Sequence, residues 1–409
     1  MAKVSRRGFF RFSGLALGVF GAGLAGLRPV AARARSKAPA FSRVLGQPAE
    51  LPKAKGRRIV VVGGGWSGLT AAKYVKKEDP GLDVVLIERR EIFVSSPISN
   101  LWLDGLVDLE FLTHSYLDAA RANDYWFFSA MVMDVDRESR RVFTNKGYVE
   151  YDFLLLAPGI DYDYPQIGVE DPEEQFRLKQ RYPGGMIPGS EDITLKNKLE
   201  AFQGGTFLLT VPVGNYRCLP APYERTCLIA DYLQRNKIKG KVMLLDGNPE
   251  ITIKRQGFEA AFERLKDYVE YVPSFKITGV DVGKKRIRSQ FEEREFDDAA
   301  IYPRVRASKL IETLGLVDPD SAQKEANIDP FKYNIKGDER VYVGGDSRPM
   351  PYSKSGNTAN SEAHYVAKVI AARANDEEIE WRSPQTICYS VVDGDPMRAI
   401  MVKTKYAYD

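Results

Sequence analysis

A buried strand that runs directly into a glycine-rich loop is the feature that most constrains the fold of this chain. Residues 58–62 (RIVVV) are a short, β-branched apolar run, which predicts a strand buried on both faces of a parallel sheet. Gly63, Gly65 and Gly68 follow in the spacing G-x-G-x-x-G, and residues 69–77 continue as a helix. Such glycines permit a tight turn, the approach of backbone amides to a pyrophosphate, and close packing of helix on strand. The segment therefore predicts a dinucleotide-binding domain. Its binding loop is predicted to consist of Gly63, Gly65, Trp66, Ser67 and Gly68.

The end of the next predicted strand supplies the acid that completes this pattern. Residues 84–88 (VVLIE) are again apolar until Glu88, which stands 20 residues after Gly68. A carboxylate at this position accepts a hydrogen bond from a ribose hydroxyl and repels a 2′-phosphate. The complete series of strand, loop, helix and acid favours a ligand site over a glycine-rich turn that binds nothing.

Two later segments distinguish between FAD and NAD. Residues 151–159 (YDFLLLAPG) predict a buried strand that ends in a Pro-Gly turn, and they resemble the second signature of flavoproteins with two dinucleotide-binding domains. Residues 340–346 (RVYVGGD) predict a strand that closes on Gly-Asp, and in that superfamily the aspartate binds the ribityl chain of FAD. Either segment alone is as consistent with an ordinary core strand. Together with the glycine loop they predict FAD, with contacts from Ala157, Gly159, Gly345 and Asp346.

A second helix N-terminus follows this last strand. Residues 351–360 (PYSKSGNTAN) lead into an alanine-rich helix that extends to about residue 372. Its N-terminus, at Ser355 and Gly356, is predicted to direct its dipole at the side of the isoalloxazine ring where negative charge collects on reduction. Lys354 is predicted to add a full positive charge there. A solvated loop lysine is the alternative, and the sequence favours neither interpretation.

The middle of the chain repeats the strand-helix-strand layout without the glycines. Residues 205–210 (GTFLLT) and 241–246 (KVMLLD) predict partner strands of a second, related domain. The turn at 211–218 (VPVGNYRC) has no G-x-G-x-x-G, and its prolines and bulky side chains stand where a second pyrophosphate needs bare backbone. NADH is therefore not expected as the electron donor.

The cysteines and their neighbours form the most specific pattern. Residues 217–225 (RCLPAPYER) contain Cys218 and Glu224, and residues 386–390 (TICYS) contain Cys388. With the flavin signatures, these motifs resemble the flavoprotein subunit of flavocytochrome c sulfide dehydrogenase and, more distantly, sulfide:quinone oxidoreductases. The resemblance covers nearly the whole chain after the leader. It implies an α/β protein with two Rossmann-like, three-layer domains of the glutathione-reductase kind and a small C-terminal segment.

This resemblance also implies roles for the site residues. Cys218 and Cys388 form a redox-active disulfide over the flavin, and Glu224 is the nearby acid or base. Hydrosulfide attacks the disulfide, and electrons pass through FAD to a c-type cytochrome. Two independent buried thiols are the alternative, since the sequence carries no Cβ distances. Cys227 lies in a helical pattern and is predicted to be an apolar packing residue.

The sequence departs from the family pattern at the flavin attachment site. The family's linking cysteine is replaced by Ser96 in the segment 96–100 (SPISN), so FAD is predicted to bind non-covalently. Only 21 residues follow Cys388, and they lack the amphipathic helices of quinone-reducing relatives. A cytochrome acceptor and no stable membrane insertion are therefore expected. A peripheral quinone reductase, and a flavin electron-transfer or assembly subunit without sulfur turnover, remain the alternatives.

The first residues read as an export signal. Residues 1–36 contain no Asp or Glu, carry Arg6-Arg7, and continue into 16 Gly-, Ala- and Leu-rich residues before a small-x-small site at 32–34. This is the twin-arginine pattern, which predicts a periplasmic protein that is exported folded. Cleavage after Ala34 removes six basic residues from a total of 59 Lys+Arg against 55 Asp+Glu. The mature charge of −2 argues against a nucleic-acid partner.

Composition excludes other chemistries. Three cysteines and two histidines are too few for a four-cysteine zinc site or imidazole-rich metal chemistry, so no metal is expected. No Cys-x-x-Cys-His is present, and the chain carries no c-type haem of its own. The predicted organisation is a signal peptide at 1–34, an extension at 35–56, a discontinuous FAD domain at 57–165 and 305–375, a second Rossmann-like domain at 166–304, and a C-terminal segment at 376–409.

Overall fold

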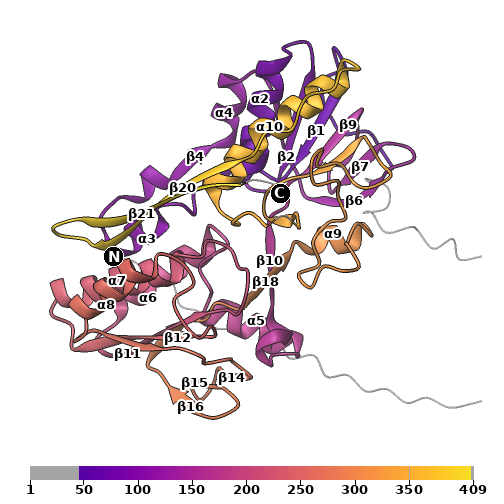
Figure 1. Ribbon diagram of the computed structural model, residues 1–409. Helices are drawn as coiled ribbons and strands as arrows, with labels where there is room; N and C mark the ends of the chain where they lie inside the picture. The colour runs from indigo at the N-terminus through magenta and orange to yellow at the C-terminus, as the bar shows by residue number, and fades with distance from the viewer. Residues whose placement is uncertain (1–45, 350, 407–409) are drawn as a thin grey trace, which may run out of the picture.

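The protein is described from a computed structural model, which describes residues 46–349 and 351–406. The predicted signal peptide and most of the predicted extension lie outside these residues. Two α/β bodies stand one above the other, and the C-terminal hairpin lies between them (Figure 1). Each body is built on a parallel sheet, which confirms the predicted fold class of two Rossmann-like domains.

The first body has a five-stranded parallel sheet in the order β19-β9-β1-β2-β5. Its central strand β1 is completely enclosed, with Ile59, Val60 and Val61 at 0% exposure, because it lies inside an apolar core to which α2 and α10 contribute. The helices α2 and α10 lie side by side on the sheet (Figure 1). The elements are β1 (Arg58–Val62), α2 (Trp66–Glu78), β2 (Asp83–Glu88), α4 (Tyr116–Ala122), β5 (Trp126–Ser129), β9 (Phe153–Leu156), β19 (Val341–Val343) and α10 (Gly356–Ala374).

The second body has a four-stranded parallel sheet in the order β13-β12-β11-β17. Phe207, Val242 and Leu244 are fully buried in it, as the apolar runs predict. Its elements are α5 (Pro172–Arg181), α6 (Ser190–Ala201), β11 (Gly205–Val211), α7 (Ala221–Arg235), β12 (Gly240–Asp246), α8 (Arg255–Arg264), β13 (Val269–Val272), β14 (Gly279–Asp281), β15 (Arg286–Arg288), β16 (Glu293–Glu295) and β17 (Asp298–Ala300).

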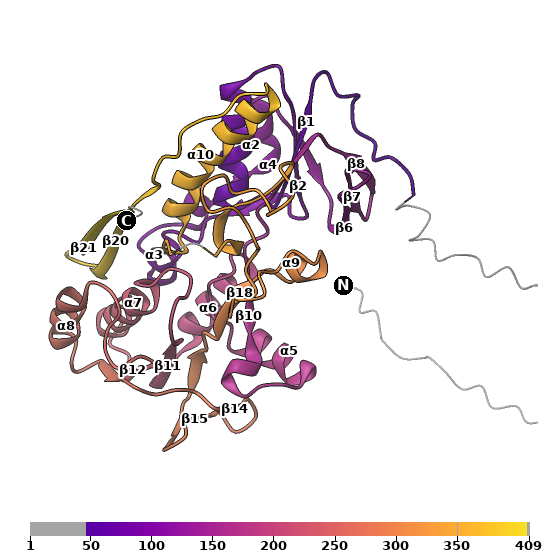
Figure 2. The same cartoon turned by 45° about the vertical axis from the view of Figure 1, so that its right-hand side comes forward.

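Two antiparallel strands connect the bodies. β10 (Ile160–Asp163) leads down from the first sheet, and β18 (Arg304–Ala307) returns beside it (Figure 2). The smaller elements are β3 (Ile92–Val94), α3 (Ser99–Asp104), η1 (Leu109–Leu112), β4 (Thr113–Ser115), β6 (Val132–Asp136), β7 (Arg141–Thr144), β8 (Gly147–Glu150), η2 (Tyr164–Ile167), α9 (Lys309–Thr313) and η3 (Gly345–Ser347).

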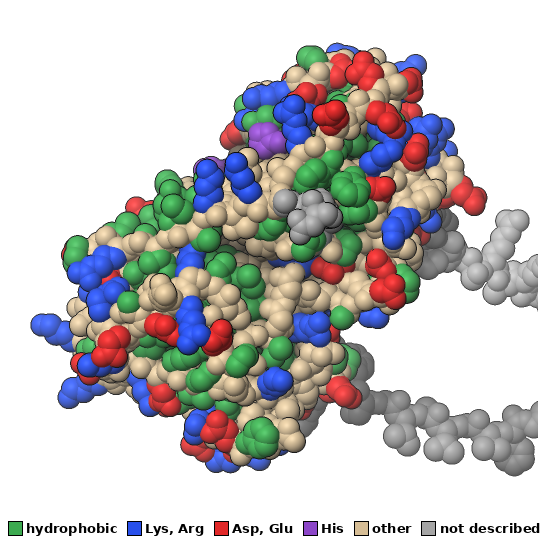
Figure 3. Space-filling model, in the orientation of Figure 1, with side chains coloured by type: hydrophobic (Ala, Val, Ile, Leu, Met, Phe, Trp, Pro, Cys, Tyr) green, Lys and Arg blue, Asp and Glu red, His purple; other side chains and the backbone are tan. Residues whose placement is uncertain are grey.

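The chain ends in an antiparallel hairpin of β20 (Gln385–Asp393) and β21 (Arg398–Lys405). The hairpin packs against α7 of the second body and α10 of the first. One of its faces carries exposed Ile387, Tyr389 and Met401. Figure 3 shows hydrophobic side chains interspersed with Lys and Arg on the face where the hairpin lies. Within the described ranges, no helix is long and apolar enough to cross a membrane.

A buried acidic pair lies beneath the hairpin turn. A Cβ on Gly394 would stand 2.6 Å from Asp231 Oδ2 and 2.9 Å from Asp104 Oδ2. Arg235 donates to both carboxylates, one of them across 2.6 Å to Asp231. Burial nevertheless raises the pKa of Asp104 to about 7, and the charge of Asp231 adds to the rise. Asp104 therefore keeps its proton at a pH where an unfolded chain has lost it.

This pair makes the stability of the fold depend on pH. The folded chain binds a proton that the unfolded chain releases near pH 4, so the free energy of unfolding falls as pH rises from about 4 to 7. In Asp104→Asn we expect the loss of stability between pH 5 and pH 8 to be smaller by about 2–3 kcal/mol. Urea unfolding at the two pH values measures it, with the exposed Asp108→Asn as control. Equal pH dependence in the Asp104 variant and the unaltered protein would contradict the assignment.

Candidate functional site

A cavity of about 370 Å³ opens at the carboxyl ends of β1, β2 and β9. Most residues predicted to bind the cofactor line it, although they come from five separate segments of the chain. Gly68 and Lys354 are the two exceptions. The predicted residues that line the cavity are Gly63, Gly65, Trp66, Ser67, Glu88, Ala157, Gly159, Gly345, Asp346, Ser355 and Gly356.

The three glycines of the loop act in different ways. Gly63 has a φ of +98°, and a Cβ on it would lie 2.3 Å from the carbonyl oxygen of Ala157. A Cβ on Gly68 would lie 1.8 Å from the carbonyl oxygen of Gly63, so this glycine brings α2 against β1. A Cβ on Gly65 would meet nothing within 4 Å. Gly65 therefore leaves bare backbone at the cavity, as close approach of a pyrophosphate requires.

This difference predicts opposite phenotypes for two glycine substitutions. Gly68→Ala forces a Cβ into the backbone of Gly63, and we expect it to lower stability by about 3 kcal/mol, the upper end for an overpacked site. Gly65→Ala places its methyl in open space, so we expect unchanged stability of the cofactor-free chain and loss of bound flavin. Thermal unfolding and the flavin absorbance of purified protein separate the two. Full flavin content in Gly65→Ala would contradict a pyrophosphate contact at this loop.

Glu88 is fixed at the edge of the cavity. The amide of Gly64 donates to its Oε2 across 2.9 Å, and Arg90 donates to its Oε1 from the backbone and from Nε. Tyr116 donates its hydroxyl proton to the carbonyl oxygen of Gly64 across 2.8 Å. These contacts hold the carboxylate beside the glycine loop, where a ribose hydroxyl of a bound dinucleotide would meet it.

Trp66 and Asp346 add two further signs of a ligand site. Trp66 lines the cavity, and its buried Nε1 has no hydrogen-bond partner within the described residues. A buried indole N–H without a partner costs free energy that a polar ligand group would relieve. Asp346 pairs with Nε of Arg217 across 3.2 Å, and Arg217 also lines the cavity. The donor set and the bare backbone together fit a dinucleotide cofactor.

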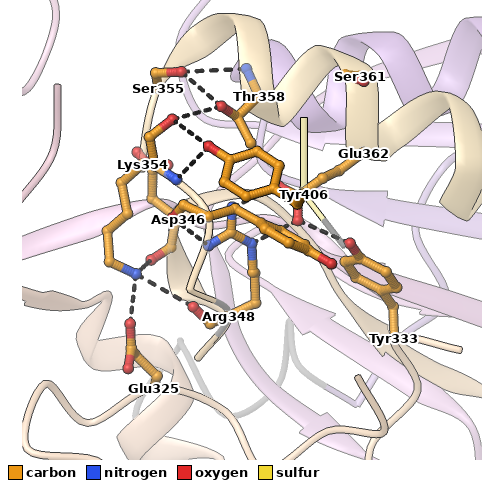
Figure 4. Close-up of polar contacts among 12 residues, drawn as sticks. Glu325, Tyr333, Asp346, Arg348, Lys354, Ser355, Thr358, Ser361, Glu362 and Tyr406 are labelled. Atoms are coloured by element: carbon orange, nitrogen blue, oxygen red, sulfur yellow. Dashed lines mark hydrogen bonds and ion pairs between the residues drawn. The ribbon is translucent and has the colours of Figure 1, made fainter. Parts of the chain in front are cut away.

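The position of Lys354 differs from both predictions made for it. Its ammonium is buried and binds Glu325 Oε1 at 2.5 Å, the carbonyl oxygen of Asp346 at 3.0 Å and that of Arg348 at 3.2 Å (Figure 4). The prediction of a positive charge directed at the flavin site is therefore wrong, because Glu325 neutralises that charge away from the cavity. A solvated loop lysine is equally wrong, and burial lowers the pKa of Lys354.

A second buried ion pair supports the same segment. Arg348 donates from Nε to Glu362 Oε1 across 2.7 Å and from Nη2 to Oε2 across 2.8 Å. Tyr333 donates its hydroxyl proton to Oε1 of the same carboxylate across 2.9 Å (Figure 4). Arg348 and Glu362 are each about 1% exposed at their side chains. The pair ties the segment after β19 to the middle of α10.

The fold brings Cys218 and Cys388 to one place. Cys218 lies in the turn before α7 with a φ of +57°, and its amide donates to the carbonyl oxygen of Lys354 across 2.6 Å. Burial raises the pKa of Cys218 to about 12, and negative charge at Cys388 adds to the rise. All three cysteines are free thiols in the structure, so the predicted disulfide is not formed in it. Cys227 is fully buried in the second core, which confirms its prediction as a packing residue.

Glu224 lies between the two cysteine segments. Its Oε1 accepts from the amide of Val391 in β20 across 2.7 Å, and its Oε2 accepts from Asn100 across 2.9 Å. Burial raises the pKa of Glu224 above its ordinary value. A carboxyl group with a raised pKa holds a proton more readily than an exposed one, which suits the predicted acid or base.

Two cations at the site were missed by the sequence interpretation. Arg217 stands beside Cys218 in the motif, and its Nη2 lies 3.5 Å from Ser96 Oγ. Lys254 lies 3.6 Å from the sulfur of Cys388 and comes from a loop with no motif. Adjacency to Cys218 could have indicated Arg217, whereas no local signal points to Lys254.

Among the residues that the structure describes, no cluster of three or more His, Cys, Asp or Glu side chains is arranged to hold a metal ion.

The fold and the cavity define a flavoprotein with two dinucleotide-binding domains. Residues 57–182 match the pyridine nucleotide-disulphide oxidoreductase family, and residues 193–303 match the family described as sulfide dehydrogenase (flavocytochrome c) flavoprotein chain, central. These matches support a flavoprotein of the pyridine nucleotide-disulphide oxidoreductase family that is related to sulfide:quinone oxidoreductases. The family recognised from the sequence is thus confirmed.

Relatives and solved structures agree with this family. The chain is 21% identical to the mitochondrial sulfide:quinone oxidoreductase of Dictyostelium discoideum, over 78% of this chain and 72% of that protein. It is 50% identical over 44 residues to the sulfide dehydrogenase flavoprotein chain of Chlorobaculum thiosulfatiphilum, over 11% of this chain and 92% of that sequence. The sulfide:quinone oxidoreductase structure from Aquifex aeolicus superposes with a TM-score of 0.69 at 16% identity, covering 85% and 87% of the chains.

Proposed function

We propose that this protein is a periplasmic, FAD-dependent sulfide dehydrogenase that passes electrons to a c-type cytochrome. The observation that carries the proposal is the meeting of Cys218, Glu224 and Cys388 beside the cavity, from the second body and the hairpin. The relatives support it, since those that match over most of the chain are named for sulfide. Flavin, when bound, supplies the two-electron oxidation-reduction chemistry.

The sulfur chemistry would take place on the chain itself. With Cys218 and Cys388 joined in the oxidised state, hydrosulfide attacks one sulfur, the bond between the cysteines breaks, and a persulfide and a thiolate form. Cys218 has a raised pKa and takes up a proton readily, and Glu224 is placed to supply one. The left-handed backbone at Cys218 is the kind of strained conformation that functional sites retain.

The cofactor is proposed to be FAD held without a covalent bond. The stretch that carries the family's attachment cysteine reaches the site, because Ser96 Oγ lies 3.5 Å from Arg217 at the cavity wall. A serine hydroxyl at this point lacks the thiol that forms the family's linkage. Denaturation with acid should therefore release all of the flavin into the supernatant.

The proposed partner is a c-type cytochrome. The hairpin that carries Cys388 exposes Tyr389 and Met401 at 67% and 56%, with Lys403 beside them. Exposed apolar side chains beside a lysine suit a transient partner with an acidic rim. Export to the periplasm is proposed from the twin-arginine pattern at the start of the chain.

Anaerobic mixing of the FAD-loaded protein with hydrosulfide tests the proposal. We expect hydrosulfide to bleach the flavin band, and oxidised cytochrome c to restore it. Absence of bleaching would overturn sulfide oxidation and favour an electron-transfer or assembly subunit. Restoration by a short-chain quinone and not by cytochrome c would favour the quinone-reducing activity that the relatives' names carry. Fractionation of cells that express the full chain tests the compartment.

A further inference from the structure

Lys254 places its ammonium against the segment that carries Cys388. Its Nζ lies 3.6 Å from Cys388 Sγ and donates to the carbonyl oxygen of Cys388 across 2.9 Å. It also donates to Ser390 Oγ across 2.9 Å and to the carbonyl oxygen of Ile400 across 3.3 Å. All four contacts belong to the hairpin, which is more than 130 residues away along the chain. One cation therefore faces both the sulfur and the two strands that present it.

The charge of Lys254 is not neutralised by an ion pair. In residues 46–349 and 351–406 no carboxylate forms a salt bridge with it. Lys354 is the contrast, since Glu325 binds its ammonium at 2.5 Å. The charge of Lys254 does act on Glu224, whose pKa it lowers, while the two oxygens of Glu224 accept hydrogen bonds from Val391 and Asn100. The direct contacts of the Lys254 ammonium are with the sulfur and the oxygens of the hairpin.

The backbone also holds Lys254 in place. The residue precedes α8 with a φ of +53°, in the left-handed region that a lysine adopts at a cost. Its side chain is half-buried between α8 and the hairpin, so solvent screens the charge less than at an open surface. A cation this close to a sulfur stabilises negative charge that develops on it.

We propose that Lys254 is a catalytic residue of the sulfur site, whose ammonium stabilises negative charge on the sulfur of Cys388. The role of Lys254 in turnover rests on the proposed function. When hydrosulfide attacks Cys388 Sγ, a new S–S bond forms and the bond to Cys218 breaks. The electron pair of the broken bond leaves with Cys218, which becomes a thiolate or, with a proton from Glu224, a thiol. Lys254 attracts the anionic nucleophile to Cys388 and stabilises the persulfide anion that results.

Alkylation of Cys388 tests the charge without flavin reduction or sulfide. Iodoacetamide reacts with thiolates, so its rate at Cys388 in the reduced protein at pH 7 reports the anionic fraction. Peptide mass spectrometry separates Cys388 from the other cysteines. We expect Lys254→Gln to slow alkylation about tenfold and Lys254→Arg to retain the unaltered rate. The exposed Lys266→Gln is the matched control and should leave the rate unchanged.

The outcomes distinguish an electrostatic role of Lys254 from a structural role in holding the hairpin. An unchanged rate in Lys254→Gln would overturn the proposal. A faster rate would also overturn it, because a loosened hairpin exposes Cys388 and Lys254 would then only hold the strands together. Equal slowing in Lys254→Gln and Lys254→Arg would refute a role for charge. If the expected order holds while hydrosulfide leaves the flavin of the unaltered protein oxidised, the assignment of Lys254 stands and the proposed sulfide oxidation fails.

Discussion

Replacement of Cys218 by serine is expected to slow the reduction of bound flavin by hydrosulfide at least about 10³-fold, the scale of effect seen when a covalent nucleophile is removed. A serine hydroxyl cannot form the bond to Cys388 that hydrosulfide is proposed to attack. The substitution is nearly isosteric, and the amide of residue 218 still donates to the carbonyl oxygen of Lys354. The flavin site should therefore stay intact while the sulfur reaction is lost. Anaerobic stopped-flow absorbance measures the rate.

Cys227 offers a control within the same helix region. It is fully buried in the second core and makes no contact that the proposed reaction uses. Cys227→Ala is expected to keep the rate of flavin reduction within about twofold, with a small loss of stability from the smaller side chain. If Cys218→Ser reduced its flavin as fast as the unaltered protein, the reaction would not pass through this cysteine.

Replacement of Arg348 by methionine is expected to cost about 3–5 kcal/mol of unfolding free energy, because it leaves Glu362 charged and buried. Tyr333 would remain the carboxylate's neighbour, and one neutral hydroxyl does not compensate a buried charge. Urea unfolding measures the loss. The double variant with Glu362→Leu should recover much of it, because apolar replacement of a buried pair is often close to neutral.

Arg373 provides the matched control for this substitution. It lies in α10 like Glu362, but its partners Glu339 and Glu378 are 70% and 71% exposed. Arg373→Met should therefore cost only about 0–1 kcal/mol. Comparable losses in Arg348→Met and Arg373→Met would show that burial of the ion pair does not set its contribution.

The cofactor site was largely predictable because its signals are local. Gly63 and Gly68 are required by backbone atoms of the same loop or of the adjacent strand, as the contact of Gly68 with Gly63 illustrates. Glu88 lies at the end of the neighbouring parallel strand, so the order of elements alone brings it to the loop. Eleven of the thirteen predicted cofactor residues line the cavity for this reason, and Gly68 packs beside it.

The contacts of Lys354 and Lys254 could not be predicted from local sequence patterns. The partner of Lys354 is Glu325, 29 residues away in a segment with no regular period. The sulfur that Lys254 faces is 134 residues away, on a hairpin whose position no motif encodes. A lysine in a loop carries the same local pattern in both cases. Only the packing of distant segments decides which lysine is neutralised by an acid and which one faces the sulfur of Cys388.

The sequence by itself determined the two parallel sheets and the dinucleotide loop, because strand periodicity and glycine spacing act over short distances. The tertiary structure alone decided the electrostatics of the sulfur site. Charges act through space and burial weakens their screening, so the contacts of Lys254, Arg217 and Glu224 depend on how the hairpin seats between the two bodies.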